Sequence, residues 1–256
     1  MLEIRNATCG YNHNAVVNNI SFSVSKGEVI CILGANGIGK TTLFKSILGS
    51  LALLNGEILL NNKNIRSISN SELARSIGYV PQAHTPPFPF SVLDVVVMGR
   101  TAHLSIFSSP SQADMNIAKK ALNTLNISHL EDKIYTEISG GERQLVLIAR
   151  ALAQNPEILI MDEPTANLDF GNQINILNTI TSLAKEGLSV VLTTHFPDHV
   201  FFCSTKVVVI KSENEVLVGK AEEVITQELL KTIYGIKIAV KKLTLNNRDA
   251  VVCVPC

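Results

Sequence analysis

The segment Gly34-Ala35-Asn36-Gly37-Ile38-Gly39-Lys40-Thr41 carries the most specific pattern in the sequence. It fits the pattern G-x-x-x-x-G-K-[ST], in which a glycine-rich loop wraps its backbone N–H groups around phosphate oxygens. The apolar run Val29–Leu33 precedes this segment, and the helical stretch Thr42–Leu48 follows it. A strand before and a helix after are the context that the motif requires, because the helix N-terminus adds its dipole to the phosphate site. The segment therefore predicts a nucleotide site.

Two residues of the segment carry the chemistry expected at such a site. Lys40 is placed to reach the β- and γ-phosphates, and the hydroxyl of Thr41 is placed to bind Mg²⁺. The other residues expected to contact the nucleotide lie in the same loop or in the first helical turn; they are Gly34, Asn36, Gly37, Ile38, Gly39 and Thr42.

Three continuous apolar runs predict the central strands of a parallel sheet. They are Val29–Leu33, Ile158–Met161 and Val190–Thr194. Runs without alternation are typical of strands that helices cover on both faces, so the fold class is α/β. Each run stops at a residue able to do chemistry, namely Gly34, Asp162 and His195. Because ligands of such sheets bind beyond the carboxyl ends of the strands, we expect the three ends to meet at one site.

An acidic pair, Asp162 and Glu163, follows the second run directly. A carboxylate at the end of a buried strand must be hydrated, paired or bound to metal, because burying an isolated charge is costly. Asp162 suits Mg²⁺, directly or through water. Glu163 is expected to orient and polarise the attacking water as a general base.

The rest of the chain divides into a strand-rich and a helical part. Leu2–Ala7, Asn19–Val24 and Gly56–Leu60 alternate more and are separated by turn signals, which predicts a small antiparallel layer. The proline-rich loop from Pro81 to Pro89 precedes a stretch, about 83 to 153, that lacks strand runs. Helices are predicted there over Ala113–Leu125 and Gln144–Ala153.

Ser139-Gly140-Gly141-Glu142 opens the second of these helices. Ser139 and Glu142 form a capping box, which explains a helix start without any ligand. Two consecutive glycines are poor helix formers, at roughly 1 kcal/mol each relative to alanine. Something is therefore expected to approach this helix end closely, and its free N–H groups suit a phosphate.

Composition narrows the function classes. The 256 residues carry 22 Lys and Arg against 22 Asp and Glu, and this balance argues against a nucleic-acid partner. The apolar stretches Val92–Met98 and Gln144–Ala153 are too short for a bilayer crossing, which needs roughly 20 residues. Five scattered cysteines and the lack of a secretory signal favour a reducing cytoplasm. Cys253-Val254-Pro255-Cys256 is formally a C-x-x-C pair, and either chance or a metal or redox use accounts for it.

The combination of these motifs, in this order, resembles ATP-binding cassette (ABC) ATPases from Tyr11 to about Val240. The resemblance implies a P-loop NTPase with a RecA-like core, an antiparallel β subdomain and a helical subdomain. It implies one domain over residues 1–256, with the core and β subdomain in 1–82 and 154–256 and the helical subdomain in 83–153. ATP and Mg²⁺ are the implied cofactors.

The resemblance also assigns roles. Tyr11 resembles the aromatic residue that stacks on adenine, and Gln82 the glutamine that touches Mg²⁺ and the attacking water. His195 resembles the switch histidine that contacts the γ-phosphate, although a strand-end tyrosine or histidine can equally be structural. The implied catalytic residues are thus Lys40, Gln82, Glu163 and His195, and the implied metal ligands are Thr41, Gln82 and Asp162.

A second set of residues is implied to act on the nucleotide of another subunit. Ser139, Gly140, Gly141 and Glu142 resemble the signature loop, with Glu142 where the family has glutamine, and Asp169 resembles the aspartate that couples the two sites. One chain holds one phosphate loop and one signature, on surfaces that cannot meet within a domain. A head-to-tail homodimer with two ATP sites is therefore expected.

The segment Phe90–Arg100 resembles that of ATPases from type II importers of iron chelates, haem, cobalamin or metal oxyanions. The resemblance implies two permease subunits as partners, a substrate-binding protein as an indirect partner, and a peripheral location on the cytoplasmic face of the membrane. The alternative is a cytosolic assembly ATPase, such as one that serves iron–sulfur scaffolds. The tail Ile236–Val252 predicts a short β extension around Asn246-Asn247 whose role the sequence does not give.

Overall fold

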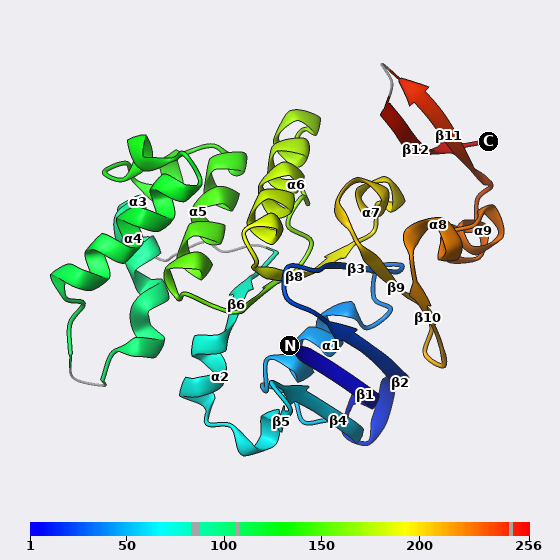
Figure 1. The fold of residues 1–256 in the computed structure, drawn as a ribbon, viewed down its shortest axis with the longest axis horizontal. Helices are drawn as coiled ribbons and strands as arrows, with labels where there is room; N and C mark the ends of the chain where they lie inside the picture. The colour runs from blue at the N-terminus through cyan, green and yellow to red at the C-terminus, as the bar shows by residue number, and fades with distance from the viewer. Residues whose placement is uncertain (83–87, 106–107, 246–247) are drawn as a thin grey trace.

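The computed structural model describes residues 1–82, 88–105, 108–245 and 248–256. Within these ranges, the centre is a six-stranded sheet with the order β10-β9-β3-β8-β7-β6 (Figure 1). Its parallel strands are β3 (Val29–Leu33), β6 (Ile77–Val80), β7 (Ile158–Met161), β8 (Ser189–Thr194) and β9 (Lys206–Ser212), and β10 (Glu215–Gly219) pairs antiparallel with β9. The three predicted strands are confirmed as β3, β8 and β7, and they are direct neighbours.

The middle strand β3 faces two separate apolar clusters. Cys31 and Leu33 pack on the side of α6 (Phe170–Lys185) and α7 (Pro197–Cys203). Ile30 and Ile32 pack on the side of α1 (Lys40–Ile47) and the antiparallel layer. Both faces are buried, which explains why the run shows no polar alternation.

The antiparallel layer is confirmed, with longer strands than predicted. Its order is β2-β1-β4-β5, with β1 (Leu2–Tyr11), β2 (Asn14–Val24), β4 (Asn55–Leu60) and β5 (Lys63–Asn64). Asn12 and His13 join β1 to β2 with φ of 48° and 66°. Positive φ at both central residues is what a type I′ hairpin turn requires, so the asparagine-rich turn signal is confirmed.

The helical part lies at one end of the molecule (Figure 1). It contains α3 (Val92–Val97), the 3₁₀ segment Met98–His103, α4 (Gln112–Thr124), the short 3₁₀ turns Ser128–Leu130 and Tyr135–Glu137, and α5 (Gly140–Ala153). Before it come the 3₁₀ turn Ile65–Ser67 and α2 (Asn70–Ser76). Helices α3, α4 and α5 pack on one another, and α4, predicted as Ala113–Leu125, buries Ala118 and Leu122. Of the proline-rich loop, residues 83–87 lie outside the described ranges.

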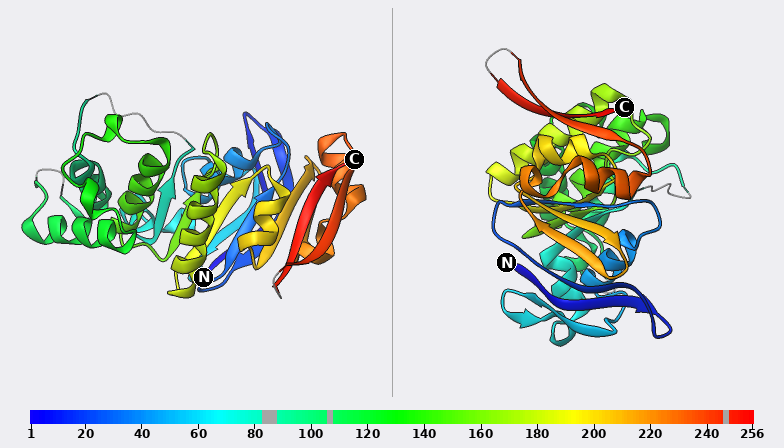
Figure 2. Two further views of the ribbon diagram at one scale, coloured as in Figure 1. Left: turned by 90° about the horizontal axis from the view of Figure 1, so that it is seen from above. Right: turned by 90° about the vertical axis from the view of Figure 1, so that its right-hand side faces the viewer.

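The chain ends in two helices and a hairpin. Helices α8 (Ala221–Val224) and α9 (Gln227–Tyr234) lead to β11 (Ile238–Leu245) and β12 (Arg248–Pro255), which form a separate two-stranded sheet (Figure 2). The predicted β extension is confirmed, and Asn246 and Asn247 lie outside the described residues. Strand β12 packs against α7. None of the helices in the described ranges has the length and apolarity that crossing a bilayer demands.

Candidate nucleotide-binding site

The loop between β3 and α1 needs glycine for steric reasons. Gly37 and Gly39 have φ of 79° and 110°, a region that side chains rarely adopt. A Cβ at Gly39 would lie 2.5 Å from Cγ2 of Val17, and one at Gly34 would lie 2.9 Å from the carbonyl oxygen of Ile210. The loop therefore keeps its backbone close to the antiparallel layer and exposes N–H groups before α1.

Lys40, the first residue of α1, is held inside this loop. Its side chain is 5% exposed, and Nζ donates to the carbonyl oxygens of Gly34 at 2.8 Å and Ala35 at 3.1 Å. Nζ also lies 3.4 Å from Oε1 of Glu163. A buried ammonium must have such partners, because losing its hydration is costly. The loop thus presents one buried positive charge where phosphate oxygens would bind.

Asp162, which directly follows β7, is hydrogen-bonded to a residue of α1 and to a residue of β8. Its carboxylate accepts hydrogen bonds from Thr41 Oγ1 at 3.0 Å and from Thr193 Oγ1 at 2.7 Å. A hydroxyl and a buried carboxylate are hard oxygen donors, and Mg²⁺ is usually held by one or two such groups together with phosphate oxygens and water. The described residues contain no group of three or more His, Cys, Asp or Glu that could hold a metal by itself. The pair Thr41 and Asp162 fits a magnesium ion that arrives with a nucleotide.

The carboxylate of Glu163 contacts the other three predicted catalytic residues, Lys40, Gln82 and His195. Its carboxylate lies 3.3 Å from Gln82 Nε2, which donates to it, and 3.3 Å from Nδ1 of His195. Its backbone has a positive φ of 46°, and its N–H donates to Thr193 Oγ1 at 2.8 Å. A bulky residue in this region is strained, and such strain persists where the surroundings fix it.

His195 has a ring nitrogen, Nδ1, that lies near an acid but makes no hydrogen bond in the described structure. Nδ1 is buried and lies 3.3 Å from Oε2 of Glu163. The ring packs against Phe196, with centroids 4.0 Å apart. Buried polar atoms without a partner are rare in native proteins and mark places where a ligand or water completes the contact.

Tyr11 lies at the rim of this site. It ends β1, is 42% exposed, and accepts a hydrogen bond from Lys45 Nζ at 3.3 Å. Hydrogen bonds from Thr42, and then from Lys45, lower the pKa of Tyr11. Tyr11 is therefore close to the first turns of α1, and its predicted role in stacking on adenine stays a prediction.

The second predicted set lies at the starts of α5 and α6. Ser139 and Glu142 form the expected capping box: Glu142 Oε2 accepts the Ser139 N–H at 2.8 Å, and the hydrogen bonds from Ser139 lower the pKa of Glu142. Asp169 caps α6, accepting from Asn172 N at 3.0 Å and Asn172 Nδ2 at 2.6 Å, and these bonds lower the pKa of Asp169.

The close approach expected at the two glycines is found at one of them. A Cβ at Gly141 would lie 2.3 Å from Oδ1 of Asn172, so Asn172 requires a glycine there. At Gly140 the nearest atom would be Cδ2 of Leu168, at an ordinary 3.6 Å. Across the described parts of the chain, no hydrogen bond or ion pair joins this second set to Lys40, Asp162 or Glu163.

The structure adds residues that the motifs did not single out. Thr193 is fully buried and contacts both Asp162 and Glu163. The hydroxyl oxygens of Thr165 and Thr194 lie 3.3 and 3.4 Å from Nδ1 of the buried His199. Burial lowers the pKa of His199. Two threonines at the end of an otherwise apolar strand were the signal available in the sequence.

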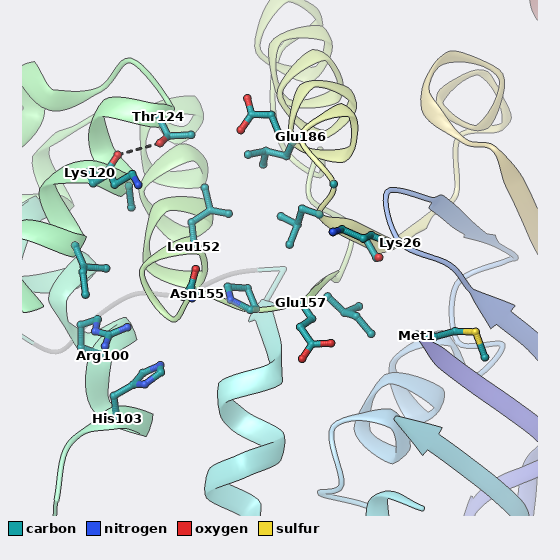
Figure 3. A pocket seen from close by; sticks show the side chains of 18 of the residues that line it. Met1, Lys26, Arg100, His103, Lys120, Thr124, Leu152, Asn155, Glu157 and Glu186 are labelled. Carbon is teal, nitrogen blue, oxygen red and sulfur yellow. Dashed lines mark hydrogen bonds between the residues drawn. The ribbon is translucent and has the colours of Figure 1, made fainter. Parts of the chain in front are cut away.

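A large cavity of about 930 Å³ lies elsewhere (Figure 3). Its lining includes Ile158 and Ser189, the first residues of β7 and β8, so it lies at the opposite edge of the sheet. Charges of both signs surround it, among them Lys26, Lys120 and Glu157 (Figure 3). No residue predicted for the nucleotide site lines this cavity.

Comparisons with known proteins agree with the site. A family model described as ABC transporter matches residues 17–166. An ABC transporter ATP-binding protein of Haemophilus influenzae, whose name gives no cargo, is 41% identical over 247 residues, or 96% of this chain and 94% of the relative. The molybdate import ATP-binding protein MolC of the same species is 36% identical over 86% of this chain and 82% of the relative. The iron(3+)-hydroxamate import ATP-binding protein FhuC of Bacillus subtilis is 32% identical over 89% and 85%.

A solved structure has the same fold. A chain described as part of a metal-chelate type ABC transporter, in an inward-facing conformation, superposes with a TM-score of 0.89 at 32% identity and covers 100% of this chain and 97% of its own. The family model matches more than half of the chain, and the relatives cover most of it. This protein therefore belongs to the ABC transporter family as an ATP-binding subunit that hydrolyses ATP.

Proposed function

We propose that this ATPase uses the carboxylate of Glu163 as its general base and powers import of a metal chelate or metal oxyanion through separate permease subunits. The observation that carries the catalytic part is the meeting of Lys40, Gln82 and His195 around Glu163. These side chains come from α1, the end of β6, the end of β8 and the end of β7, so the sheet itself brings them together.

The roles follow from charge and reach. Lys40 exchanges its carbonyl and carboxylate partners for the β- and γ-phosphates of ATP. Glu163, released from Lys40, takes the proton of the attacking water, while Gln82 orients that water. His195, whose Nδ1 has no hydrogen bond, holds the γ-phosphate through its ring. Thr41, Asp162 and Gln82 would hold Mg²⁺, which neutralises the phosphate charge when bound.

The second set of residues supports a head-to-tail dimer. Among the described residues, no hydrogen bond or ion pair joins Ser139–Glu142 or Asp169 to the phosphate loop, and the starts of α5 and α6 are exposed at Ser139, Gly140 and Asp169. Phe170, beside Asp169, is 78% exposed, which is unusual for a phenylalanine and suits a surface that another copy covers. In this pairing each nucleotide lies between the phosphate loop of one copy and the Ser139–Glu142 loop of the other.

A groove on another side suits the permease. A cavity of about 630 Å³ is lined by the C-terminal end of α1, by α2 and β6, by the 3₁₀ segment Met98–His103, and by α5. Met98, which is 38% exposed, and Tyr79 lie on its wall. This groove includes the end of Phe90–Arg100, and Tyr79 is only three residues from Gln82. We propose that a helix of the permease docks here and thereby reaches the catalytic centre.

The cargo class rests on the relatives. The names of two relatives give molybdate and iron(3+)-hydroxamate, and the solved transporter is described as metal-chelate type. All three descriptions name a metal, carried either as a chelate or as an oxyanion. The chain would then lie on the cytoplasmic face of the membrane, attached through two permease subunits, with a substrate-binding protein as an indirect partner.

The experiment is recovery of the tagged chain from detergent-solubilised native membranes, with partners identified by mass spectrometry. We expect a polytopic membrane protein in equal amount. Thr101→Arg, at the groove, should lose this partner and keep basal ATP hydrolysis, whereas Thr232→Arg on the exposed face of α9 should keep both. Recovery only from the soluble fraction, with a scaffold protein attached, would favour the cytosolic assembly ATPase instead.

A further inference from the structure

The end of the chain contacts the loop that carries His195. Helix α9 ends at Tyr234, and Gly235, with φ of 73°, reverses the chain toward β11. The Tyr234 hydroxyl donates a hydrogen bond of 2.7 Å to the carbonyl oxygen of His195. Burial raises the pKa of Tyr234, so the phenol keeps its proton and remains a donor. The contact joins residues 39 positions apart.

The hairpin makes a second contact with the same region. The backbone N–H of Cys253, in β12, donates to Oδ1 of Asp198 at 2.8 Å. Asp198 lies in the first turn of α7, three residues after His195. Strand β12 packs along α7, and Figure 2 shows the hairpin beside that helix. The tail, defined as residues 227–256, therefore holds the His195 segment at two points.

The side chain of His195, in this segment, reaches the proposed catalytic centre at Glu163. Phe196 N donates to Thr194 Oγ1 at 3.0 Å, which fixes the segment to the end of β8. The His195 ring contacts Phe196, and its Nδ1 lies 3.3 Å from Oε2 of Glu163. A shift of the backbone at His195 moves the imidazole relative to Glu163, and displacements of about 1 Å at catalytic groups cost large factors in rate.

We propose that Tyr234 is a positioning residue of the ATPase site: its hydroxyl, assisted by the Asp198–Cys253 contact, holds His195 where its ring meets Glu163 and the γ-phosphate. The inference rests on the proposed roles of His195 and Glu163. It gives the tail a part in turnover beyond packing.

The first experiment compares Tyr234→Phe with Thr232→Val. Tyr234→Phe removes only the hydroxyl, and the loss of a neutral hydrogen bond should lower kcat about three- to tenfold with KM for ATP unchanged. Thr232→Val removes a hydroxyl of the same helix that bonds to the carbonyl oxygen of Glu228, and should leave kcat unchanged. Equal kcat for the two variants would overturn the proposal.

A double-mutant cycle separates positioning from general loss of stability. In a His195→Ala background there is no ring to position, so Tyr234→Phe should change the residual kcat less than about twofold. The same three- to tenfold fall in that background would mean that Tyr234 acts on the fold and would contradict the proposal. Thermal unfolding of each variant checks that all are folded at the assay temperature.

The second contact is tested by a conservative pair. Asp198→Asn keeps an oxygen acceptor for the Cys253 N–H and should retain kcat, whereas Asp198→Ala should lower kcat like Tyr234→Phe. If both variants keep wild-type turnover, this contact has no part in positioning. Glu163→Gln serves as the reference throughout: unchanged hydrolysis there would overturn the proposed catalytic centre, whereas silent tail variants alone overturn only the role of the tail.

Discussion

The hydroxyl of Thr193 donates a hydrogen bond of 2.7 Å to Oδ1 of Asp162. Oγ1 of Thr193 also accepts the backbone N–H of Glu163 at 2.8 Å, so one side chain of β8 orients both acids at the end of β7. Thr193 is fully buried, and the other oxygen of Asp162, Oδ2, accepts a hydrogen bond of 3.0 Å from Thr41 Oγ1.

Replacing this threonine should therefore impair catalysis more than folding. Thr193→Val keeps the shape but removes one of the two hydroxyls that bond to Asp162 and leaves the Glu163 N–H without its acceptor, so we expect kcat to fall about tenfold or more. Thr179→Val, in which the lost hydroxyl bonds only to the carbonyl oxygen of Asn175 in α6, is the matched control. Steady-state hydrolysis of both variants measures the difference, and similar rates would refute the role of Thr193.

Glu163→Gln should bind ATP and lose turnover. The amide keeps the size of the side chain but cannot accept the proton of water, so hydrolysis should fall by about 10²- to 10⁴-fold. Size-exclusion chromatography should then show a stable ATP-dependent dimer. Glu157→Gln, at the opposite edge of the sheet, changes an acid that accepts a hydrogen bond from Asn61 and should leave hydrolysis intact. Undiminished turnover in Glu163→Gln would rule out its role as the base.

Lys40→Ala should lose nucleotide binding. The variant removes the buried ammonium of the phosphate loop, and charge-assisted hydrogen bonds to phosphate account for an expected loss of about 100-fold in ATP affinity. Lys185→Ala, at the exposed end of α6, is the control. Calorimetric titration with ATP measures both affinities, and tight binding by Lys40→Ala would contradict the assignment of the loop.

The contact between Gly141 and Asn172 predicts an uneven response to alanine. Gly141→Ala places a Cβ 2.3 Å from Asn172 Oδ1, so we expect a loss of about 1–3 kcal/mol in the free energy of unfolding. Gly140→Ala, with 3.6 Å of space, should be neutral or stabilising. Denaturant unfolding of the double variant Gly141→Ala with Asn172→Ala should recover most of the loss. If Gly141→Ala alone is as stable as Gly140→Ala, the close contact does not exist in solution.

The ion pair between Arg100 and Asp114 predicts a pH dependence of stability. Hydrogen bonds from Ser111, and then from Arg100, hold the pKa of Asp114 below its ordinary value. The folded state therefore binds this proton less readily than the unfolded state, whose pKa is about 3.9. The ionised carboxylate adds stability above that value, and the contribution declines as the pH falls below it. Asp114→Asn should thus be destabilising at pH 7, and its difference from the wild type should shrink at pH 3.5. Asp132→Asn is the exposed control, and a difference that stays constant with pH would contradict the assignment.

The sequence predicted the parts of this site that depend on local spacing. Lys40 and Thr41 follow from the glycine loop, Asp162 and Glu163 from an apolar run that ends in acids, and the start of α5 from Ser139 and Glu142. The family resemblance added Gln82, and it gave a role at the γ-phosphate to His195, which the end of an apolar run had already singled out. These residues are close to Glu163 in the structure because the strands that carry them are neighbours.

Contacts between distant segments could not be predicted in the same way. Tyr234 and His195 are 39 residues apart, and Asn172 reaches Gly141 from another helix. Nothing in the local sequence says which surfaces the tail or α6 will meet, because that depends on the order of the strands and on how the helices pack. Strand β9 was also missed, although its run Val207–Ile210 is as apolar and as buried as β3.

The separation of the two predicted sets within one chain turns activity into a matter of mass action. Under the proposed pairing, a lone copy binds ATP through Lys40 but lacks the Ser139–Glu142 loop of a second copy, and dilution should silence it. Two copies fixed to one membrane complex would face each other at an effective concentration on the order of millimolar. Attachment to the permease would then raise the rate of hydrolysis at low subunit concentration, without any change in the shape of the subunit, and a dilute unassembled surplus would waste little ATP.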